Sequence, residues 1–187
     1  MIYIRTCPIP KDNPMKTLVI HPADESTNFL SPIYEGKGWT VLTDGLAESL
    51  EVKALIEEHD RIVMMGHGAP NGLFGGSGMI IDETFIDLLQ TKETVYIWCH
   101  VDKFVNKYNL KGFYTGMFIS ELDEAIYCGV TDGTQEHIDY SNELFAHTVG
   151  QFIETEYLLE NTKALYHGDD TPNPIIEYNR VRLFYNA

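Results

Sequence analysis

The chain has 187 residues, of which 44% are hydrophobic and 12% aromatic, a composition typical of one folded domain and not of a disordered segment. The formal net charge is −15 and the 13 basic residues are scattered, which argues against binding to nucleic acid or to an anionic membrane surface. Three widely spaced cysteines, no signal-peptide pattern and no apolar run of roughly 20 residues predict a cytoplasmic protein with reduced thiols and no membrane span.

Strand-like and helix-like patterns alternate along the chain after an irregular, proline-rich start that contains Cys7, a residue we expect to be incidental. Short apolar runs predict strands at 17–20, 39–43, 61–65, 94–98, 125–130 and 181–185. Helical spacing predicts helices at 47–58, 83–90, 101–109 and 134–154, and Ser26 and Thr27 can cap another short helix. A glycine-rich loop covers 66–78, a short extended piece follows at 79–81, and the pattern from 114 to 120 is ambiguous.

This alternation predicts an α/β fold, a three-layer sandwich with a mostly parallel central sheet and helices on both faces. We expect a single domain over 1–187, with its core at about 17–154 and a C-terminal extension at 155–187. In such sheets the active crevice lies beyond the carboxyl ends of the strands, so the residues that follow each strand are the first candidates for chemistry.

His67 and Cys99 follow two of the predicted central strands directly. Neighbouring strands lie about 4.8 Å apart, so the two side chains can face one pocket. A cysteine acts as a nucleophile in its thiolate form, and histidine is the base that takes and returns a proton near neutral pH. The backbone N–H groups of Gly68 and Cys99 are candidate donors to a developing oxyanion.

The two motifs, Ile62-Val63-Met64-Met65-Gly66-His67-Gly68 and Val95-Tyr96-Ile97-Trp98-Cys99, resemble those of the caspase-like superfamily, which also includes gingipains, clostripain, legumain and separase. In that family one apolar strand ends in His-Gly and a later one ends in the nucleophilic cysteine. The resemblance covers roughly residues 17–154. It implies a cysteine endopeptidase that hydrolyses peptide bonds of a protein or peptide substrate with a His67–Cys99 dyad and without a cofactor.

Two positions depart from the family pattern. Trp98 stands where the family often has a small residue, and His100 follows the cysteine where a glycine is common. These departures favour an alternative, a catalytically inactive caspase-like module that binds a peptide or a small ligand. The sequence leaves open whether the chain needs processing, an activating ligand or a partner, and it leaves its oligomeric state open.

The resemblance also implies where substrate specificity resides, since loops after the first strand and after the strand that follows the cysteine form the pocket in the family. Here those loops carry Asp24, Thr131 and Asp132. Because a carboxylate there would pair with arginine or lysine, we expect cleavage after a basic residue, with Asp24 as the best candidate. The alternative is that Asp24 belongs to a helix cap. Asp44 and Asp102 are further candidates as supporting groups.

Other chemistries fit the sequence less well. A zinc site built from His67, Cys99 and His100 lacks paired ligands at a familiar spacing, so no metal is predicted. The glycine-rich loop matches neither a serine nucleophile elbow nor a phosphate-binding loop. Cys128 lies in the predicted strand 125–130 and is expected to be a buried core residue.

Overall fold

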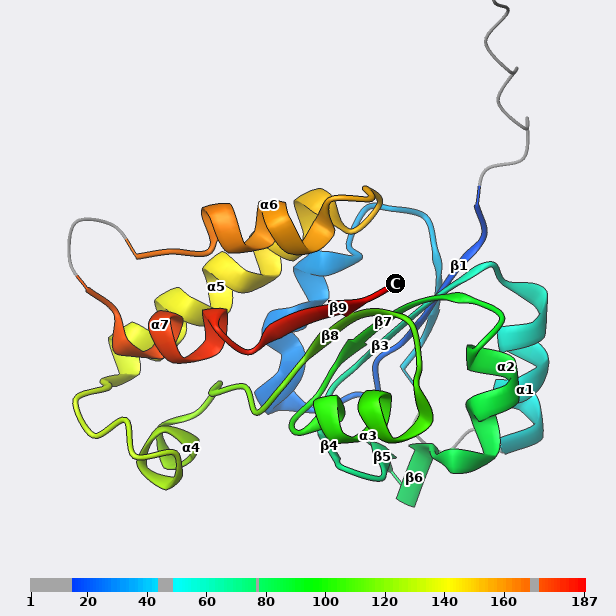
Figure 1. Cartoon of the computed structure of the whole chain (residues 1–187), viewed down its shortest axis with the longest axis horizontal. Coiled ribbons are helices and arrows are strands. Elements are labelled where there is room, and N and C mark those ends of the chain that lie inside the picture. The colour runs from blue at the N-terminus through cyan, green and yellow to red at the C-terminus, as the bar shows by residue number, and fades with distance from the viewer. Residues whose placement is uncertain (1–14, 44–48, 77, 169–171) are drawn as a thin grey trace, which may run out of the picture.

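In the computed structural model, residues 15–43, 49–76, 78–168 and 172–187 are described, and they build a six-stranded central sheet (Figure 1). The strand order is β2-β1-β3-β7-β8-β9. The strands are β1 (Thr17–Ile20), β2 (Thr40–Leu42), β3 (Arg61–Met65), β7 (Glu93–Ile97), β8 (Gly112–Thr115) and β9 (Leu183–Asn186). The first five run parallel and β9 is antiparallel to β8, so the predicted α/β class and the mostly parallel sheet are confirmed.

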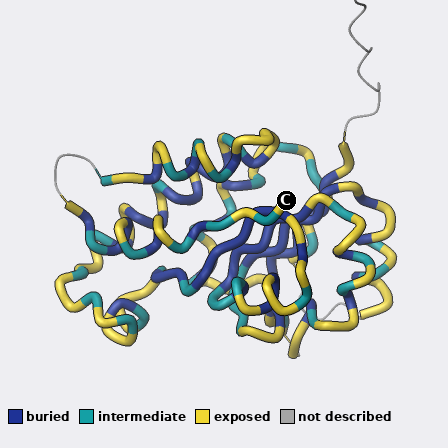
Figure 2. Tube along the Cα trace, in the orientation of Figure 1, coloured by how far each residue is buried: buried dark blue, intermediate teal, exposed yellow. Residues whose placement is uncertain are grey.

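The central strands are apolar throughout because both faces of the sheet are covered. Alternate side chains of β1, β3 and β7 enter two separate cores, and the buried strands form the dark centre of Figure 2. One core takes Leu18, Ile62, Met64 and Tyr96 from these strands, and the other takes Val19, Val63, Met65 and Val95.

Helices lie on both faces of the sheet. One layer consists of α1 (Ser49–Glu58), η2 (Glu83–Phe85), α2 (Ile86–Leu89) and α3 (Val101–Tyr108). The other consists of η1 (Glu25–Ile33), α5 (Gln135–Phe152), α6 (Leu158–Leu165) and α7 (Pro174–Arg180). Each layer contributes apolar side chains to its own core, which produces the expected sandwich. In α1 the buried residues are Val52 and Ile56, whereas Leu50 points to solvent.

The glycine-rich stretch after β3 forms a small antiparallel sheet where the sequence pattern predicts mainly a loop. Its strands are β4 (Gly68–Ala69), β5 (Gly72–Gly75) and β6 (Gly78–Ile81), and β6 contains the predicted extended piece. The Trp98 indole N–H donates to the carbonyl oxygen of Ala69 at 3.1 Å, which ties this small sheet to the end of β7.

The strand predicted at 125–130 is wrong: this segment holds the helix α4 (Leu122–Tyr127) and a turn. A capping box, in which Glu121 and Glu124 exchange side-chain to backbone hydrogen bonds, starts the helix just before the apolar residues. Burial is one-sided, with Ala125 buried and Tyr127 81% exposed, as on a surface helix. The fifth parallel strand is β8 instead, and Cys128 is a partly buried residue at the end of α4.

The C-terminal residues are part of the fold and not an appendage. The predicted last strand is present as β9, which pairs with β8, and α6 and α7 bury Leu158, Tyr166 and Ile176 in the second core. Within the described part of the chain, no helix has both the length and the hydropathy that crossing a membrane requires.

Candidate functional site

The predicted dyad lies at one edge of the sheet because β3 and β7 are direct neighbours in register. Met65 pairs with Ile97 at their carboxyl ends, and the Gly66 N–H donates to the Ile97 carbonyl at 3.0 Å. His67 and Cys99 therefore leave adjacent strands at the same level. These two described side chains share no hydrogen bond in the structure.

Cys99 stands in a sharp turn between β7 and α3. His100, the next residue, has a left-handed backbone with φ of 64°, and its N–H donates to the Gly116 carbonyl at 3.3 Å. For a residue other than glycine this conformation costs about 1–2 kcal/mol, and strain of this kind gathers at functional sites. The turn places Cys99 between the end of β7 at Ile97 and the start of α3 at Val101.

The Cys99 thiol is held by two acceptors. Its Sγ lies 3.5 Å from the Phe118 carbonyl oxygen and 3.5 Å from Oε1 of Glu124, on α4. Burial, and then the negative charge of Glu124, raise the pKa of Cys99 to about 12. The thiol is consequently protonated at neutral pH. The other oxygen of Glu124 accepts from the Ser120 N–H at 2.7 Å, which fixes the carboxylate in place.

His67 is oriented by a serine and an aspartate from η1 and its N-cap. The Ser26 hydroxyl lies 2.6 Å from Nε2 of His67 and donates to Oδ1 of Asp24 at 2.7 Å. Hydrogen bonds from the Ser26 hydroxyl and the Ser26 amide lower the pKa of Asp24, so its carboxylate is ionised and accepts only. Since the one proton of Ser26 goes to Asp24, Nε2 of His67 must be the donor to Ser26. Whenever the ring is neutral, its lone pair is therefore on Nδ1.

Ser26 carries a hydroxyl and contacts His67, so it is an alternative candidate for the nucleophile. A catalytic serine gives its proton to the histidine nitrogen that it contacts. Here that nitrogen already carries a proton, and the serine donates to Asp24 instead. Ser26 therefore acts as a donor to Asp24 and as an acceptor from His67.

Gly68 and Trp98 fit each other closely. A Cβ atom on Gly68 would overlap the Trp98 indole and would lie 2.7 Å from the Gly72 carbonyl oxygen. Trp98 is 2% exposed and packs edge-on against Tyr96 and Phe104, with ring centroids 5.8 Å apart in both pairs. Trp98, which differs from the pattern of the caspase-like superfamily, thus fills the core. Only glycine fits at position 68. The oxyanion role of Gly68 and Cys99 stays a prediction.

The residues predicted to contact substrate lie in two different loops. Asp24 is the N-cap of η1, accepting from the Ser26 N–H, and it also faces His67 at 3.5 Å. Thr131 and Asp132 lie in an exposed turn between α4 and α5. The capping alternative for Asp24 is therefore present in the structure, whereas contact of Asp24, Thr131 or Asp132 with substrate stays a prediction.

A cleft of about 490 Å³ opens beside Ser26, between η1, the start of α4 and α5. Four of its lining residues are acidic, and none is basic: Glu25, Glu121, Asp123 and Asp139. Asn142, which is 8% exposed, also lines it, and Oδ1 of Asn142 has no partner among the described residues. The sequence alone does not predict this cleft or the roles of Ser26 and Glu124, because no local pattern brings η1, α4 and α5 together.

Three further residues were named from the sequence as supporting or incidental groups: Asp102, Asp44 and Cys7. Asp102 lies in the first turn of α3, with Oδ1 buried and unpartnered within the described residues. Asp44 and Cys7 lie outside the described residues. In the part of the chain that the structure describes, no three His, Cys, Asp or Glu side chains are grouped as metal ligands would be, and His67, Cys99 and His100 do not form such a group.

The fold and the site together define a mostly parallel α/β domain with a histidine and a cysteine at the carboxyl edge of its sheet. No family model, curated protein or solved structure matches this chain. Its function is consequently argued from the geometry of the site.

Proposed function

We propose that this chain is a caspase-like cysteine endopeptidase in which Cys99 is the nucleophile and His67 the general base. One observation carries the proposal: His67 and Cys99 follow directly paired strands, and the Asp24–Ser26 pair holds His67 by Nε2. A base needs a free lone pair and a fixed ring, and this arrangement supplies both at Nδ1.

The reaction follows from these positions. The Cys99 thiol gives its proton to Nδ1 of His67, and the thiolate adds to the substrate carbonyl carbon. The N–H groups of Gly68 and Cys99 bind the oxyanion. The C–N bond breaks as His67 returns the proton to the leaving amine, which leaves a thioester. Water then attacks the thioester, with His67 taking its proton and returning it to the thiol, and the acid product departs.

Before substrate binds, the thiol of this proposed enzyme is protonated and hydrogen-bonded. With a pKa of about 12 and hydrogen bonds to Phe118 and Glu124, Cys99 is not a ready nucleophile before substrate binds. A substrate that takes the place of the Glu124 contact would remove the nearby negative charge and free the sulfur to approach His67.

The acidic cleft beside Ser26 supports cleavage after arginine or lysine. Four carboxylates and the unpartnered Oδ1 of Asn142 are acceptors that a guanidinium or ammonium group can use. Ser26 lines this cleft and also contacts His67, so a bound side chain would lie next to the base. These carboxylates are better placed for this role than Thr131 and Asp132.

A second candidate is a caspase-like module that binds a peptide without cleaving it. The observation that favours it is the protonated, acceptor-bound thiol of Cys99. In that case substrate binding would not lower the thiol pKa, and the acidic cleft would serve only to capture a basic peptide.

Cleavage of a fluorogenic peptide library, varied at the residue before the scissile bond, tests the proposal with the wild type and three variants. We expect turnover after arginine or lysine in the wild type and none in Cys99→Ala or His67→Ala. Ser26→Ala should keep measurable turnover, reduced about 10- to 100-fold, because it loses the positioning of His67 but not the nucleophile. Unchanged turnover in Cys99→Ala would contradict the proposal, and a folded wild type that binds basic peptides without cleaving them would favour the binding module.

A further inference from the structure

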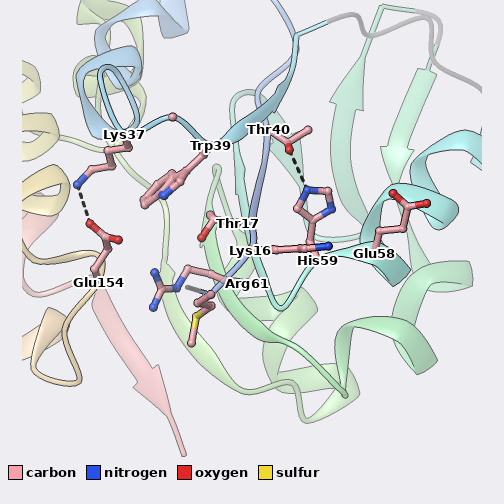
Figure 3. A pocket seen from close by; sticks show the side chains of 11 residues that line it. Lys16, Thr17, Lys37, Trp39, Thr40, Glu58, His59, Arg61 and Glu154 are labelled. Carbon is pink, nitrogen blue, oxygen red and sulfur yellow. Dashed lines mark hydrogen bonds and ion pairs between the residues drawn. The ribbon is translucent and has the colours of Figure 1, made fainter. Parts of the chain in front are cut away.

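A second hollow, of about 810 Å³, lies at the opposite edge of the sheet, where the strands begin (Figure 3). Thr17 and Arg61, the paired first residues of β1 and β3, line it together with Trp39 and His59. Arg61 and His67 are separated by an extended strand, so the hollow is roughly 20 Å from the proposed catalytic edge. It is a separate site that the peptidase proposal does not use.

Arg61 is a buried cation whose hydrogen-bonding capacity is only partly used. Its side chain is 6% exposed, and its Nε and Nη2 both contact a single oxygen of Glu93, at 2.7 Å each. A guanidinium has five N–H donors, and an anion is the natural acceptor for those that remain. The side chain of Glu93 is itself 49% exposed, so it does not seal the guanidinium from the hollow.

The Thr17 hydroxyl is a second, independent group that a ligand in this hollow can contact. Thr17 is 3% exposed and its Oγ1 has no hydrogen-bond partner among the described residues. Buried hydroxyls are rarely left unpaired, and a bound group can supply the partner that the protein does not. Figure 3 shows Thr17 between the Trp39 ring and the Arg61 guanidinium, so one ligand could contact all three.

The charge on this edge differs from that of the rest of the molecule. An adjoining hollow shares Arg61 and Glu154 with the first. Together the two are lined by five basic residues, namely Lys16, Lys37, Arg61, Lys92 and Lys111. They are lined by four acidic residues, whereas the whole chain has 28 acidic and 13 basic residues. Five of the 13 basic residues of the chain thus line these two hollows, a larger basic share than in the chain as a whole, which favours an anion here despite the net charge of −15.

Trp39 supplies a flat surface beside these charges. Its indole is partly exposed and lines the hollow, and Nζ of Lys37 lies 5.1 Å from the ring centroid. Lys37 also pairs with Glu154 at 3.3 Å, a partly exposed contact that an incoming anion can replace. An aromatic ring next to cations is the arrangement on which heteroaromatic bases stack.

We propose that this hollow binds a mononucleotide, with the phosphate at Arg61 and Thr17 and the base against Trp39. The volume lies in the range of small-molecule sites, about 300–1,000 Å³. Phosphate accepts hydrogen bonds from both the guanidinium and the hydroxyl, and the ring of the base uses the indole face. The ligand touches β1 and β3 at the ends away from the catalytic edge.

Isothermal titration of the full chain with adenosine 5′-monophosphate tests this proposal. We expect one binding site per chain, with adenosine and ribose 5-phosphate each at least tenfold weaker than the nucleotide. Thr17→Val, which removes the unpaired hydroxyl and keeps the side-chain shape, should weaken binding at least tenfold without lowering the thermal midpoint. Trp39→Leu, just before the edge strand β2, should also weaken the nucleotide but leave ribose 5-phosphate unchanged.

Thr162→Val is the matched control, because the Thr162 hydroxyl is also buried and unpaired among the described residues but lies on α6, outside the hollow. It should bind the nucleotide as the wild type does. The proposal is overturned if the nucleotide does not bind at millimolar concentration, or if Thr17→Val and the wild type bind it equally. It is also overturned if ribose 5-phosphate binds as tightly as the nucleotide, since the site would then recognise the anion alone.

Discussion

Glu124 contacts the Cys99 thiol at 3.5 Å and contributes to the rise in the pKa of that thiol. Of the causes that raise the pKa of Cys99 to about 12, burial is the largest and the charge of Glu124 the next. A raised pKa means that the thiolate fraction stays small and keeps growing with pH beyond the range in which an ordinary cysteine is fully ionised.

Replacing Glu124 by glutamine should therefore lower the pKa of Cys99 and speed its alkylation by iodoacetamide at pH 8. The rate should rise up to about tenfold for each unit by which the pKa falls. In the wild type the rate should still be increasing at about pH 10, above the ordinary range of a cysteine. Asp123→Asn, one residue earlier on α4, is the control and should behave like the wild type. Equal rates for the wild type and Glu124→Gln would show that the carboxylate does not govern the thiol.

Gly68→Ala tests the fit between the small sheet and Trp98. The added methyl group would overlap the buried indole and approach the Gly72 carbonyl, so neighbouring atoms must shift. We expect a loss of about 1–3 kcal/mol in the free energy of unfolding, the usual cost of overpacking, measured by urea denaturation. Gly129→Ala is the comparison, because that glycine has φ of 78° but open space around it and should lose only about 1 kcal/mol. A Gly68 variant that is less destabilised than the Gly129 variant would contradict the close fit.

At the level of residues, the sequence predicted the positions that follow from the order of the parallel strands. The positions of His67 and Cys99 follow from two apolar strands that end in register. The link from Ser26 to His67 spans 41 residues, and that from Glu124 to Cys99 spans 25. Both depend on how η1 and α4 pack, and a capping pattern such as Asp24-Glu25-Ser26 gives no sign of its distant partner.

Among the elements, the loop before α4 is held by one buried side chain of α7. Asn179 is fully buried, accepts from the Ile119 N–H at 2.8 Å and donates to the Ile119 carbonyl at 2.9 Å. Ile119 follows Phe118, whose carbonyl oxygen accepts from the Cys99 thiol. The C-terminal helix therefore positions part of the wall around the proposed nucleophile.

Asn179→Ala should cost about 2–3 kcal/mol in the free energy of unfolding, because both backbone groups of the buried Ile119 lose their partner. It should also increase the rate of Cys99 alkylation, since the Phe118 loop is released. Asn161→Ala, at a partly buried position of α6, is the control and should lie within about 0.5 kcal/mol of the wild type in urea denaturation. A stable Asn179 variant with an unchanged alkylation rate would mean that the loop is held by other contacts.

The wrong prediction of a strand at 125–130 also has a cause at the level of elements. Ala125-Ile126-Tyr127-Cys128-Gly129-Val130 is apolar and β-branched enough to match a buried strand, and short apolar runs cannot be assigned by periodicity alone. The decisive signal was the pair Glu121 and Glu124, whose capping box starts a helix. The true fifth strand, β8, begins with Gly112, whose left-handed φ of 107° and contact with Thr94 only the folded sheet explains.

Over the whole molecule, charge is distributed unevenly between the two edges of the sheet. Acidic residues surround the cleft beside Ser26, and basic residues gather at the hollow around Arg61. Composition alone predicted an acidic protein but not this difference in charge between the two edges. The basic residues around the hollow are spread between positions 16 and 111 of the chain. The two proposed sites, one for a basic side chain and one for an anion, thus lie at opposite edges of the sheet.

The net charge also predicts how stability responds to salt. Among the described residues, Lys37, Arg61 and Lys107 pair with carboxylates, which is few against a net charge of −15, so much of the negative charge is uncompensated and repulsive. Raising sodium chloride from about 20 to about 300 mM shortens the screening length several-fold and should raise the thermal midpoint by a few degrees. The double variant Asp123→Asn/Asp139→Asn, which removes two charges from the acidic cleft, should have a higher midpoint at low salt and a smaller rise. A midpoint that falls with salt would mean that attractive ion pairs outweigh the repulsion between carboxylates.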